Sequence, residues 1–225
     1  DIVDAIILAA GMGQRMNVGM NKMFLKLNGR EILYHTAKKF FDCELTEKII
    51  IVAKKDELDD CRKICSEFKE KTEFVIGGET RQQSSYNGVC ASESECVLIH
   101  DGARPFITNR DIVSVAENAA KYGAAAVGCG CVDTLKKTKN GFISETVNRD
   151  EVVKIYTPQG FKRSLIKELH ERAFSDNISV TDDSSICEHY GVGVKLVEGN
   201  PLNIKITSQS DLIMAKAIIS YTEES

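Results

Sequence analysis

The chain has 225 residues, of which 43% are hydrophobic and 28% charged, and its formal net charge at pH 7 is −4. This length and apolar content suit one domain with a sizeable core, and the small negative charge argues against a broad basic surface for nucleic acid. No apolar run approaches the roughly 18 residues of a membrane-spanning helix, and no signal-peptide pattern opens the chain, so we expect a cytoplasmic protein without a membrane partner.

The eight cysteines contain no C-x-x-C pair and no histidine partner at zinc-finger spacing. Several lie in apolar segments such as residues 124–132. We expect buried, reduced thiols rather than disulfides or metal ligands.

The first 130 residues alternate between two kinds of pattern. Short runs rich in β-branched residues predict buried strands at residues 4–10, 48–54, 72–78, 96–102 and 123–132. Helical spacing of apolar residues lies between them, at residues 31–41, 57–68, 80–92 and 109–122. This alternation predicts an α/β fold with a mostly parallel sheet and helices on both faces.

Local signals refine three of these helices. The first helix places Ile32, Leu33, Thr36 and Phe40 on one face. Thr80 and Gln83 have the spacing of a capping box at the start of the third helix. Asn109 is the predicted N-cap of the fourth helix.

After residue 132 the alternation stops. Apolar and polar residues alternate around Asn140-Gly141, which predicts a two-residue β-hairpin. Both faces of this ribbon are too polar for the core sheet, and a lone hairpin is marginal in water. We expect it to pack against a second copy of the chain, and the alternative is a hairpin folded back on its own domain. The predicted elements that follow are a helix at 162–174, a helix capped by Thr181, a strand pair at 194–199 and 203–207, and a helix from near Ser208.

The loop after the first strand carries Gly11, Gly13, Arg15 and Lys22. Ligands of open parallel sheets bind beyond the C-terminal ends of the strands, where this loop starts. Its spacing fits neither a dinucleotide fingerprint nor a Walker A loop. Glycines let backbone N–H groups approach anionic oxygens, and the two cations suit a polyphosphate. The alternative is a loop whose charges are merely solvated.

Two further strand ends carry polar groups. The segment "LIHDGARPF" at residues 98–106 ends its strand with Asp101 and Arg104. Asp101 could hold a substrate hydroxyl or a Mg²⁺-bound water, and Arg104 could hold a phosphate. The alternative is an internal ion pair that braces the turn. "VIGGETRQQSS" at residues 75–85 adds Ser84 and N–H groups that could bind a base edge, whereas His100 is interpreted as structural.

Seven motifs in order carry a resemblance that covers nearly the whole chain. They are LAAGMGQRM…NK, GGETRQQS, HDGARP, VDTLKKT, TVNRDEVVKIYTPQGF, VTDDSS and VEGNPLNIKIT. Together they resemble the polyol phosphate cytidylyltransferases, and most nearly the 2-C-methyl-D-erythritol 4-phosphate cytidylyltransferase family of non-mevalonate isoprenoid synthesis. This chain has Asn21-Lys22-Met23 where the family usually has Pro-Lys-Gln, and Gly102 where it has alanine. The missing proline bears on how Lys22 is positioned.

The resemblance implies one Rossmann-like nucleotidyltransferase domain over residues 1–225, with residues 133–155 as a β-arm that forms a homodimer. It implies transfer of CMP from CTP to the polyol phosphate, with Mg²⁺ bound mainly through the CTP phosphates and Asp101 as the one candidate protein ligand for the metal. The implied catalytic residues are Arg15, Lys22, Arg149 and Lys205, and Arg149 would reach the partner's site. The implied nucleotide-binding residues are Ala9, Ala10, Gly11, Gly13, Gly78, Glu79 and Ser84. The implied substrate-binding residues are Asp101, Arg104, Thr157 and Thr181.

Three alternative functions differ from this expectation. A ribitol-5-phosphate cytidylyltransferase would have a similar architecture. A nucleotide-sugar glycosyltransferase usually has D-x-D at the strand end, where this chain has Asp101-Gly102-Ala103. A non-catalytic nucleotide-binding module would keep the fold without turnover.

Overall fold

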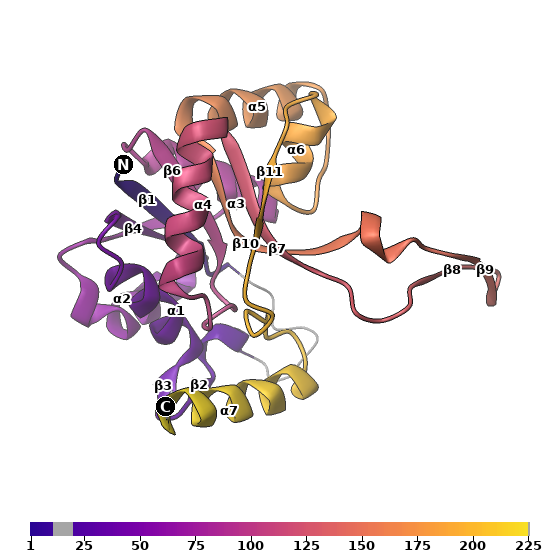
Figure 1. Ribbon diagram of the computed structural model, residues 1–225. Helices are drawn as coiled ribbons and strands as arrows, with labels where there is room; N and C mark the ends of the chain where they lie inside the picture. Colours follow the sequence, from indigo (N-terminus) through magenta and orange to yellow (C-terminus); the bar gives the residue numbers. More distant parts are fainter. Residues whose placement is uncertain (11–19, 225) are drawn as a thin grey trace.

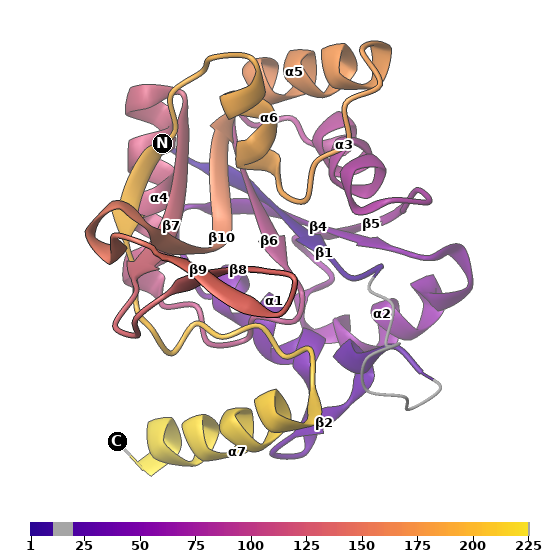
Figure 2. The same ribbon diagram turned by 90° about the vertical axis from the view of Figure 1, so that its right-hand side faces the viewer.

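The computed structural model describes residues 1–10 and 20–224. Its main sheet has seven strands in the order β11-β7-β10-β6-β1-β4-β5 (Figures 1 and 2). These strands are β1 (Val3–Leu8), β4 (Thr46–Ala53), β5 (Thr72–Ile76), β6 (Cys96–Asp101), β7 (Ala124–Gly130), β10 (Val153–Lys162) and β11 (Lys195–Glu198). All neighbours are parallel except β10, which runs antiparallel to both β6 and β7. The predicted mostly parallel sheet is confirmed, whereas the sequence patterns missed β10.

Helices cover both faces of the sheet, as predicted. The helices are α1 (Ile32–Phe41), α2 (Leu58–Ile64), α3 (Arg81–Ala91), α4 (Asn109–Tyr122), α5 (Arg163–Ser175), α6 (Asp183–His189) and α7 (Gln209–Glu224). Strand β1 shows why two layers form: Ala5 and Ile7 join the core with α1, α2 and α4, whereas Ile6 and Leu8 join the core with α3, α5 and α6. The predicted buried face of α1 is confirmed.

Short elements complete the chain. The 3-10 turns include η2 (Lys22–Phe24), η3 (Lys55–Glu57), η4 (Ser66–Phe68) and η5 (Arg149–Glu151). Strands β2 (Lys26–Leu27) and β3 (Arg30–Glu31) form a small antiparallel pair. Helix α7 packs on this pair through a separate apolar cluster at the base of the molecule (Figure 2).

Four local predictions differ from the structure. Thr108, not Asn109, caps α4, because its extended backbone lets its hydroxyl accept from the N–H of Asp111. Asp182, not Thr181, caps α6 in the same way. Residues 203–207 form no strand, because their backbone bonds to a loop instead, as in the Ile206 N–H that donates to Ala103 O. The Thr80 cap of α3 is confirmed, but the Gln83 side chain bonds Asn87 instead of closing a capping box.

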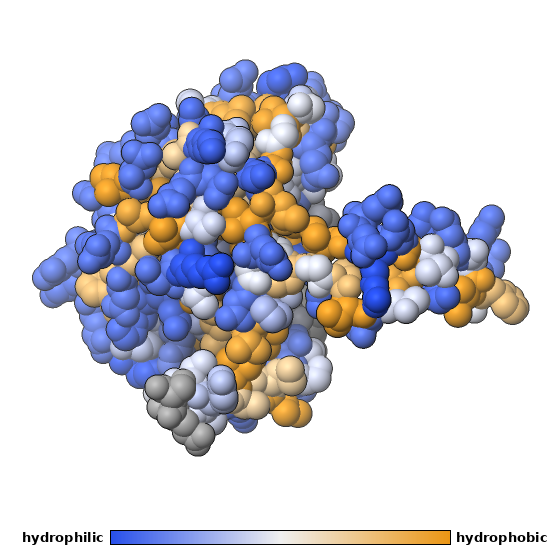
Figure 3. All heavy atoms as spheres, viewed as in Figure 1, coloured by the Kyte–Doolittle hydropathy of each residue, from blue (hydrophilic) through white to orange (hydrophobic). Residues whose placement is uncertain are grey.

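The predicted hairpin is confirmed and forms an arm that projects from the body (Figure 1). Its strands β8 (Lys136–Lys139) and β9 (Phe142–Thr146) are joined by Asn140 and Gly141, both with positive φ, as a two-residue turn requires. Every residue of both strands is exposed, so the hairpin does not fold back on its own domain. Apolar residues, among them Phe142 and Ile143, are interspersed with charged ones on its surface (Figure 3).

All eight cysteines are free thiols. Most are buried as predicted, but Cys90 is exposed and Cys131 half-buried. Burial raises the pKa of Cys61, Cys65 and Cys187 to about 12, so these thiols are protonated at neutral pH. Within the part of the chain that the structure describes, no helix is long and apolar enough to cross a membrane.

Candidate active site

The C-terminal end of β6 gathers four charged side chains from three separate stretches of chain. Asp101 is the last residue of β6, and its Oδ1 lies 3.2 Å from Arg81 Nη2. Its Oδ2 lies 3.3 Å from Arg104 Nε and 3.5 Å from Lys205 Nζ. Burial raises the pKa of Asp101, but Arg81, Lys205 and Arg104 lower it further than burial raises it, so the net shift is well below its ordinary value. One buried carboxylate therefore holds three cations at the edge where ligands of such sheets bind.

Thr157 and His100 form a chain of hydrogen bonds that ends at the backbone N–H of Asp101. The Thr157 hydroxyl accepts from the Asp101 backbone N–H at 3.0 Å and lies 2.9 Å from His100 Nδ1. His100 Nε2 lies 2.9 Å from the carbonyl oxygen of Arg104, to which it donates when the ring is neutral. Burial lowers the pKa of His100 to about 4, so the ring is neutral at pH 7. These contacts agree with the structural interpretation of His100, and they give the Thr157 side chain internal partners.

Asn203 joins its own segment to the turn that carries Arg104 and to the strand that carries Thr157. Its backbone oxygen accepts from Arg104 Nη1 at 2.8 Å, and its side-chain amide donates to Thr157 O at 2.9 Å. The ring of Tyr156 lies 4.9 Å from the Arg104 guanidinium carbon, which gives Arg104 an aromatic neighbour as well as an ion pair. The side chain of Arg104 is thereby held at three points.

A second group of predicted residues meets at the end of β1. Ala9 donates its N–H to Val52 O, and Ala10 is the last residue of the first described range. A Cβ on Gly77 would lie 3.3 Å from Ala10 Cβ and 2.8 Å from Ser84 Oγ, so these residues are in close contact. The Ser84 hydroxyl accepts from the Gly78 N–H at 3.1 Å. The predicted nucleotide residues Ala9, Ala10, Gly78 and Ser84 therefore lie together.

Lys22 is held near the same strand end by its neighbour. Asn21 is buried, its amide donates to Ala9 O at 2.7 Å, and its Oδ1 accepts from the Met23 N–H at 3.0 Å. These bonds start the η2 turn that carries Lys22. The predicted residues Gly11, Gly13 and Arg15 lie outside the described residues.

The two departures from the family pattern contact each other. A Cβ on Gly102 would lie 2.5 Å from Met23 Sδ and 2.8 Å from Leu8 O. Met23 thus fills the space that an alanine side chain at position 102 would need.

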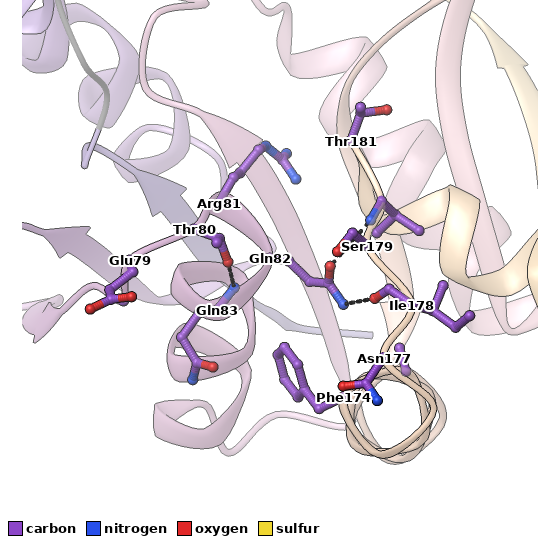
Figure 4. Close-up of a pocket in the computed structure, with 13 residues that line it drawn as sticks. Glu79, Thr80, Arg81, Gln82, Gln83, Phe174, Asn177, Ile178, Ser179 and Thr181 are labelled. Carbon is purple, nitrogen blue, oxygen red and sulfur yellow. Dashed lines mark hydrogen bonds between the residues drawn. The ribbon is translucent and has the colours of Figure 1, made fainter.

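A groove of about 750 Å³ separates the start of α3 from the segment before α6 (Figure 4). Glu79 and Thr181, which were predicted to bind nucleotide and polyol phosphate, lie on opposite walls and are exposed. Gln82 links the walls, because its amide donates to Ile178 O at 3.1 Å and its Oε1 accepts from the Val180 N–H at 3.2 Å.

Arg149 lies apart from the other predicted residues. It begins the η5 turn on the arm, is exposed, and donates to Val132 O at 2.5 Å. The arm leaves the body before it reaches this turn (Figure 1). Within one chain, the structure therefore shows no contact between Arg149 and the Asp101 cluster among the described residues.

Asp101 does not fit the role of a metal ligand in this arrangement. Each of its carboxylate oxygens already lies against at least one cationic side chain. Within residues 1–10 and 20–224, no group of three or more histidine, cysteine or acidic side chains could hold a metal ion.

Sequence reasoning missed Arg81, Asn203 and the anchoring role of Asn21. Arg81 stood inside a quoted motif, two residues after Glu79, and a cation in the first turn of a helix is unfavourable unless an anion compensates it. The unfavourable position of Arg81 in the first turn of α3 was the sequence signal that it has an acidic partner. Asn203 and Asn21 act mainly through backbone groups distant in sequence, and no local pattern marks such contacts.

The chain is similar to proteins of one known family over nearly its whole length. The family model described as 2-C-methyl-D-erythritol 4-phosphate cytidylyltransferase matches residues 3–221. The chain belongs to this family. The cytidylyltransferase of that name from Clostridium novyi is 46% identical over 220 residues, which cover 96% of this chain and 95% of the relative. The one from Geobacillus thermodenitrificans is 41% identical over 220 residues, with 96% of each chain covered.

Solved structures agree with this family assignment. The 4-diphosphocytidyl-2C-methyl-D-erythritol synthase from Anaerococcus prevotii matches with a TM-score of 0.87 and 33% identity, over 97% of this chain and 96% of that one. The cytidylyltransferase from Thermus thermophilus matches with a TM-score of 0.84 and 30% identity, over 98% of this chain and 100% of that one. The cytidylyltransferase fold therefore spans the chain, and the resemblance stated from seven motifs is confirmed.

Proposed function

We propose that the protein transfers CMP from CTP to 2-C-methyl-D-erythritol 4-phosphate and releases pyrophosphate. The observation that carries the proposal is the family match over residues 3–221. The three cations around Asp101 support it, because they lie at the sheet edge where this fold class binds its ligands.

The reaction needs positioned charge more than it needs a base. A phosphate oxygen of the polyol phosphate attacks the α-phosphorus of CTP, a new P–O bond forms, and the bond to the β-phosphate breaks as pyrophosphate leaves. A phosphomonoester has a second pKa of about 6, so its oxygen is already ionised at pH 7 and needs no general base. The difficulty is the approach of two anions, which fixed cations relieve.

The residues divide into two subsites. The end of β1 and the start of α3 hold CTP through Ala9, Ala10, Gly11, Gly13, Gly78, Glu79 and Ser84. Arg104, Thr157, Thr181 and Lys205 hold the polyol phosphate around Asp101. Arg15 and Lys22 stabilise the charge that builds on the phosphates. Mg²⁺ bound through the CTP oxygens would supply further neutralisation of that charge.

A homodimer completes each site in this proposal. Arg149 lies on an arm that is exposed on all sides of its hairpin, and the arm carries the apolar side chains of Phe142 and Ile143 in water. A lone two-stranded hairpin gains little stability by itself, which favours a second subunit as its partner. Arg149 would then enter the partner's site and bind the polyol phosphate there.

A screen of substrates tests the function. The protein is mixed with each of the four nucleoside triphosphates and methylerythritol phosphate or ribitol 5-phosphate, and pyrophosphate release is measured. We expect turnover with CTP and methylerythritol phosphate. A preference for ribitol 5-phosphate would identify the protein as a ribitol-5-phosphate cytidylyltransferase. CTP binding measured by calorimetry, without pyrophosphate release, would identify it as a nucleotide-binding module.

The cytoplasmic location belongs to the same proposal. The free thiols, most of them buried, suit a reducing compartment.

A further inference from the structure

Arg81 bridges two aspartates that belong to different elements. It is the first residue of α3, directly after the Thr80 N-cap, and it points toward the segment that carries Thr181 (Figure 4). Its Nη1 donates to Asp183 Oδ2 at 3.0 Å, and its Nη2 donates to Asp101 Oδ1 at 3.2 Å. The two ends of one planar guanidinium thus join the start of α6 to the end of β6.

Asp183 fixes one end of this bridge. Its side chain is 1% exposed, and its Oδ1 accepts from Ser85 Oγ at 2.6 Å and lies 3.1 Å from His170 Nε2. Burial raises the pKa of Asp183, but Arg81, His170 and Ser85 lower it more, to about 2. Asp183 is therefore ionised at neutral pH, and helices α3 and α5 both hold it in place.

Asp101 forms the other end, and its two oxygens have separate partners. Oδ1 accepts from Arg81, while Oδ2 lies against Arg104 and Lys205. A rotation of this carboxylate would change the position of Oδ2 and with it the anchor of both cations. The bond from Arg81 opposes such a rotation.

We propose that Arg81 is a positioning residue for the polyol phosphate. Held by Asp183, it sets the orientation of Asp101 and so places Arg104 and Lys205 where they receive the substrate phosphate. Its own backbone belongs to the helix whose start binds CTP, so it also fixes the two subsites relative to each other. This inference rests on the proposed function, and it adds a residue that contacts neither substrate.

Steady-state kinetics of Arg81→Met and Arg81→Lys test the proposal. A hydrogen bond to a charged group contributes enough that its loss costs about 10- to 100-fold in binding. We expect Arg81→Met to raise the KM for methylerythritol phosphate by about that factor, with a change in the KM for CTP of less than about threefold. Arg81→Lys keeps the charge but cannot span both carboxylates, so its effect falls between wild type and Arg81→Met.

Two further variants separate positioning from general stability. Asp183→Asn weakens the anchor and should raise the same KM, and Asp183→Asn with Arg81→Met should cost no more than Arg81→Met alone, because both act through one chain of contacts. Arg62→Met removes an exposed arginine from its pair with Asp59 on α2 and should leave both KM values unchanged.

The outcomes are distinct. If Arg81→Met does not fold, the KM values of Arg81→Lys and Asp183→Asn test the proposal instead, because each of these variants keeps a polar side chain at the substituted position. An unchanged KM for the polyol phosphate in folded variants, or equal losses for both substrates, overturns the inference while leaving the function intact. A wild-type enzyme that releases no pyrophosphate removes the proposed function and the inference together.

Discussion

Asn21 restrains the turn that carries Lys22 through hydrogen bonds, whereas a proline would restrain it through its ring. The family usually has proline directly before the lysine that corresponds to Lys22, and this chain has Asn21 there. The Asn21 side chain ties the turn to Ala9 O and caps η2 through the Met23 N–H. The segment that carries Lys22 is therefore fixed to the end of β1 by side-chain contacts rather than by a restricted φ.

Lys22→Ala should reduce kcat by about 10²–10³-fold, the usual cost of removing one group that stabilises charge in the transition state. Arg15→Ala should do the same if it acts on the same phosphates. Initial rates of pyrophosphate release give the answer, with circular dichroism and Tm as controls for folding. A folded Lys22→Ala enzyme with near-normal turnover would contradict the role.

Gly102→Ala should destabilise the protein by about 1–3 kcal/mol, because the new Cβ would lie 2.5 Å from Met23 Sδ and 2.8 Å from Leu8 O. Met23→Gln with Gly102→Ala restores the family's usual pair of residues. We expect the double variant to lose less stability than the sum of the two single variants, measured by chemical denaturation. Strict additivity would show that the two positions are independent.

The charged residues at strand ends were predictable because a carboxylate or arginine directly after an apolar strand can face only one edge of the sheet. Asp101 and Arg104 were found in this way, whereas Ser84 was predicted from the glycine-bearing strand end that precedes its helix. Arg81 was not, because its partners lie 20 and 102 residues away in sequence. Only the tertiary fold, in which α6 packs against α5 and α5 against α3, brings Arg81 and Asp183 together.

Helix α6 begins at a buried, ionised carboxylate, Asp183. Asp183 has its pKa lowered to about 2 in the folded protein, so it favours the folded state at every pH above its ordinary value near 4, and this contribution is lost as pH falls toward 2. From the size of the shift, the contribution is about 2 kcal/mol.

Asp183→Asn should therefore lower the Tm at pH 7, and the difference from wild type should shrink as pH falls below about 4. Thermal unfolding between pH 7 and pH 3 measures it. A Tm difference that stays constant over this range would show that the charge of Asp183 contributes nothing to stability.

Strand β10 is an element that the sequence pattern does not predict. Its first three residues are exposed and the next six buried, so no period of two runs through it, and Pro158 lies in its middle. A proline normally argues against a central strand. Here the register with β7 is interrupted between Ile155 and Gln159, and that irregularity accommodates it. Pairing with β6 and β7, which lie far away in sequence, decides the conformation.

The exposed hairpin arm is the main feature of the molecule as a whole. An exposed hairpin was predictable from Asn140-Gly141 and two polar faces. If Arg149 acts in the partner's site, it and Lys205 serve the same site from different subunits.

Mixing subunits tests that arrangement. Arg149→Ala and Lys205→Ala homodimers should each be nearly inactive with the polyol phosphate. After unfolding and refolding together, about half of the dimers are mixed and each has one intact site, so about a quarter of wild-type activity should return. No recovery, with dimers confirmed by sedimentation, would place both residues in the site of one chain.

Strand β10 also connects the arm directly to the cluster around Asp101. It starts just after η5 and runs through Thr157, whose hydroxyl accepts from the backbone N–H of Asp101. Tension applied at the arm would thus travel along one continuous segment to the carboxylate that gathers the cations. If a second subunit docks on the arm, as proposed above, this segment would couple that docking to the Asp101 cluster. A compound that holds the arm away from the second subunit should then weaken substrate capture without entering the crevice.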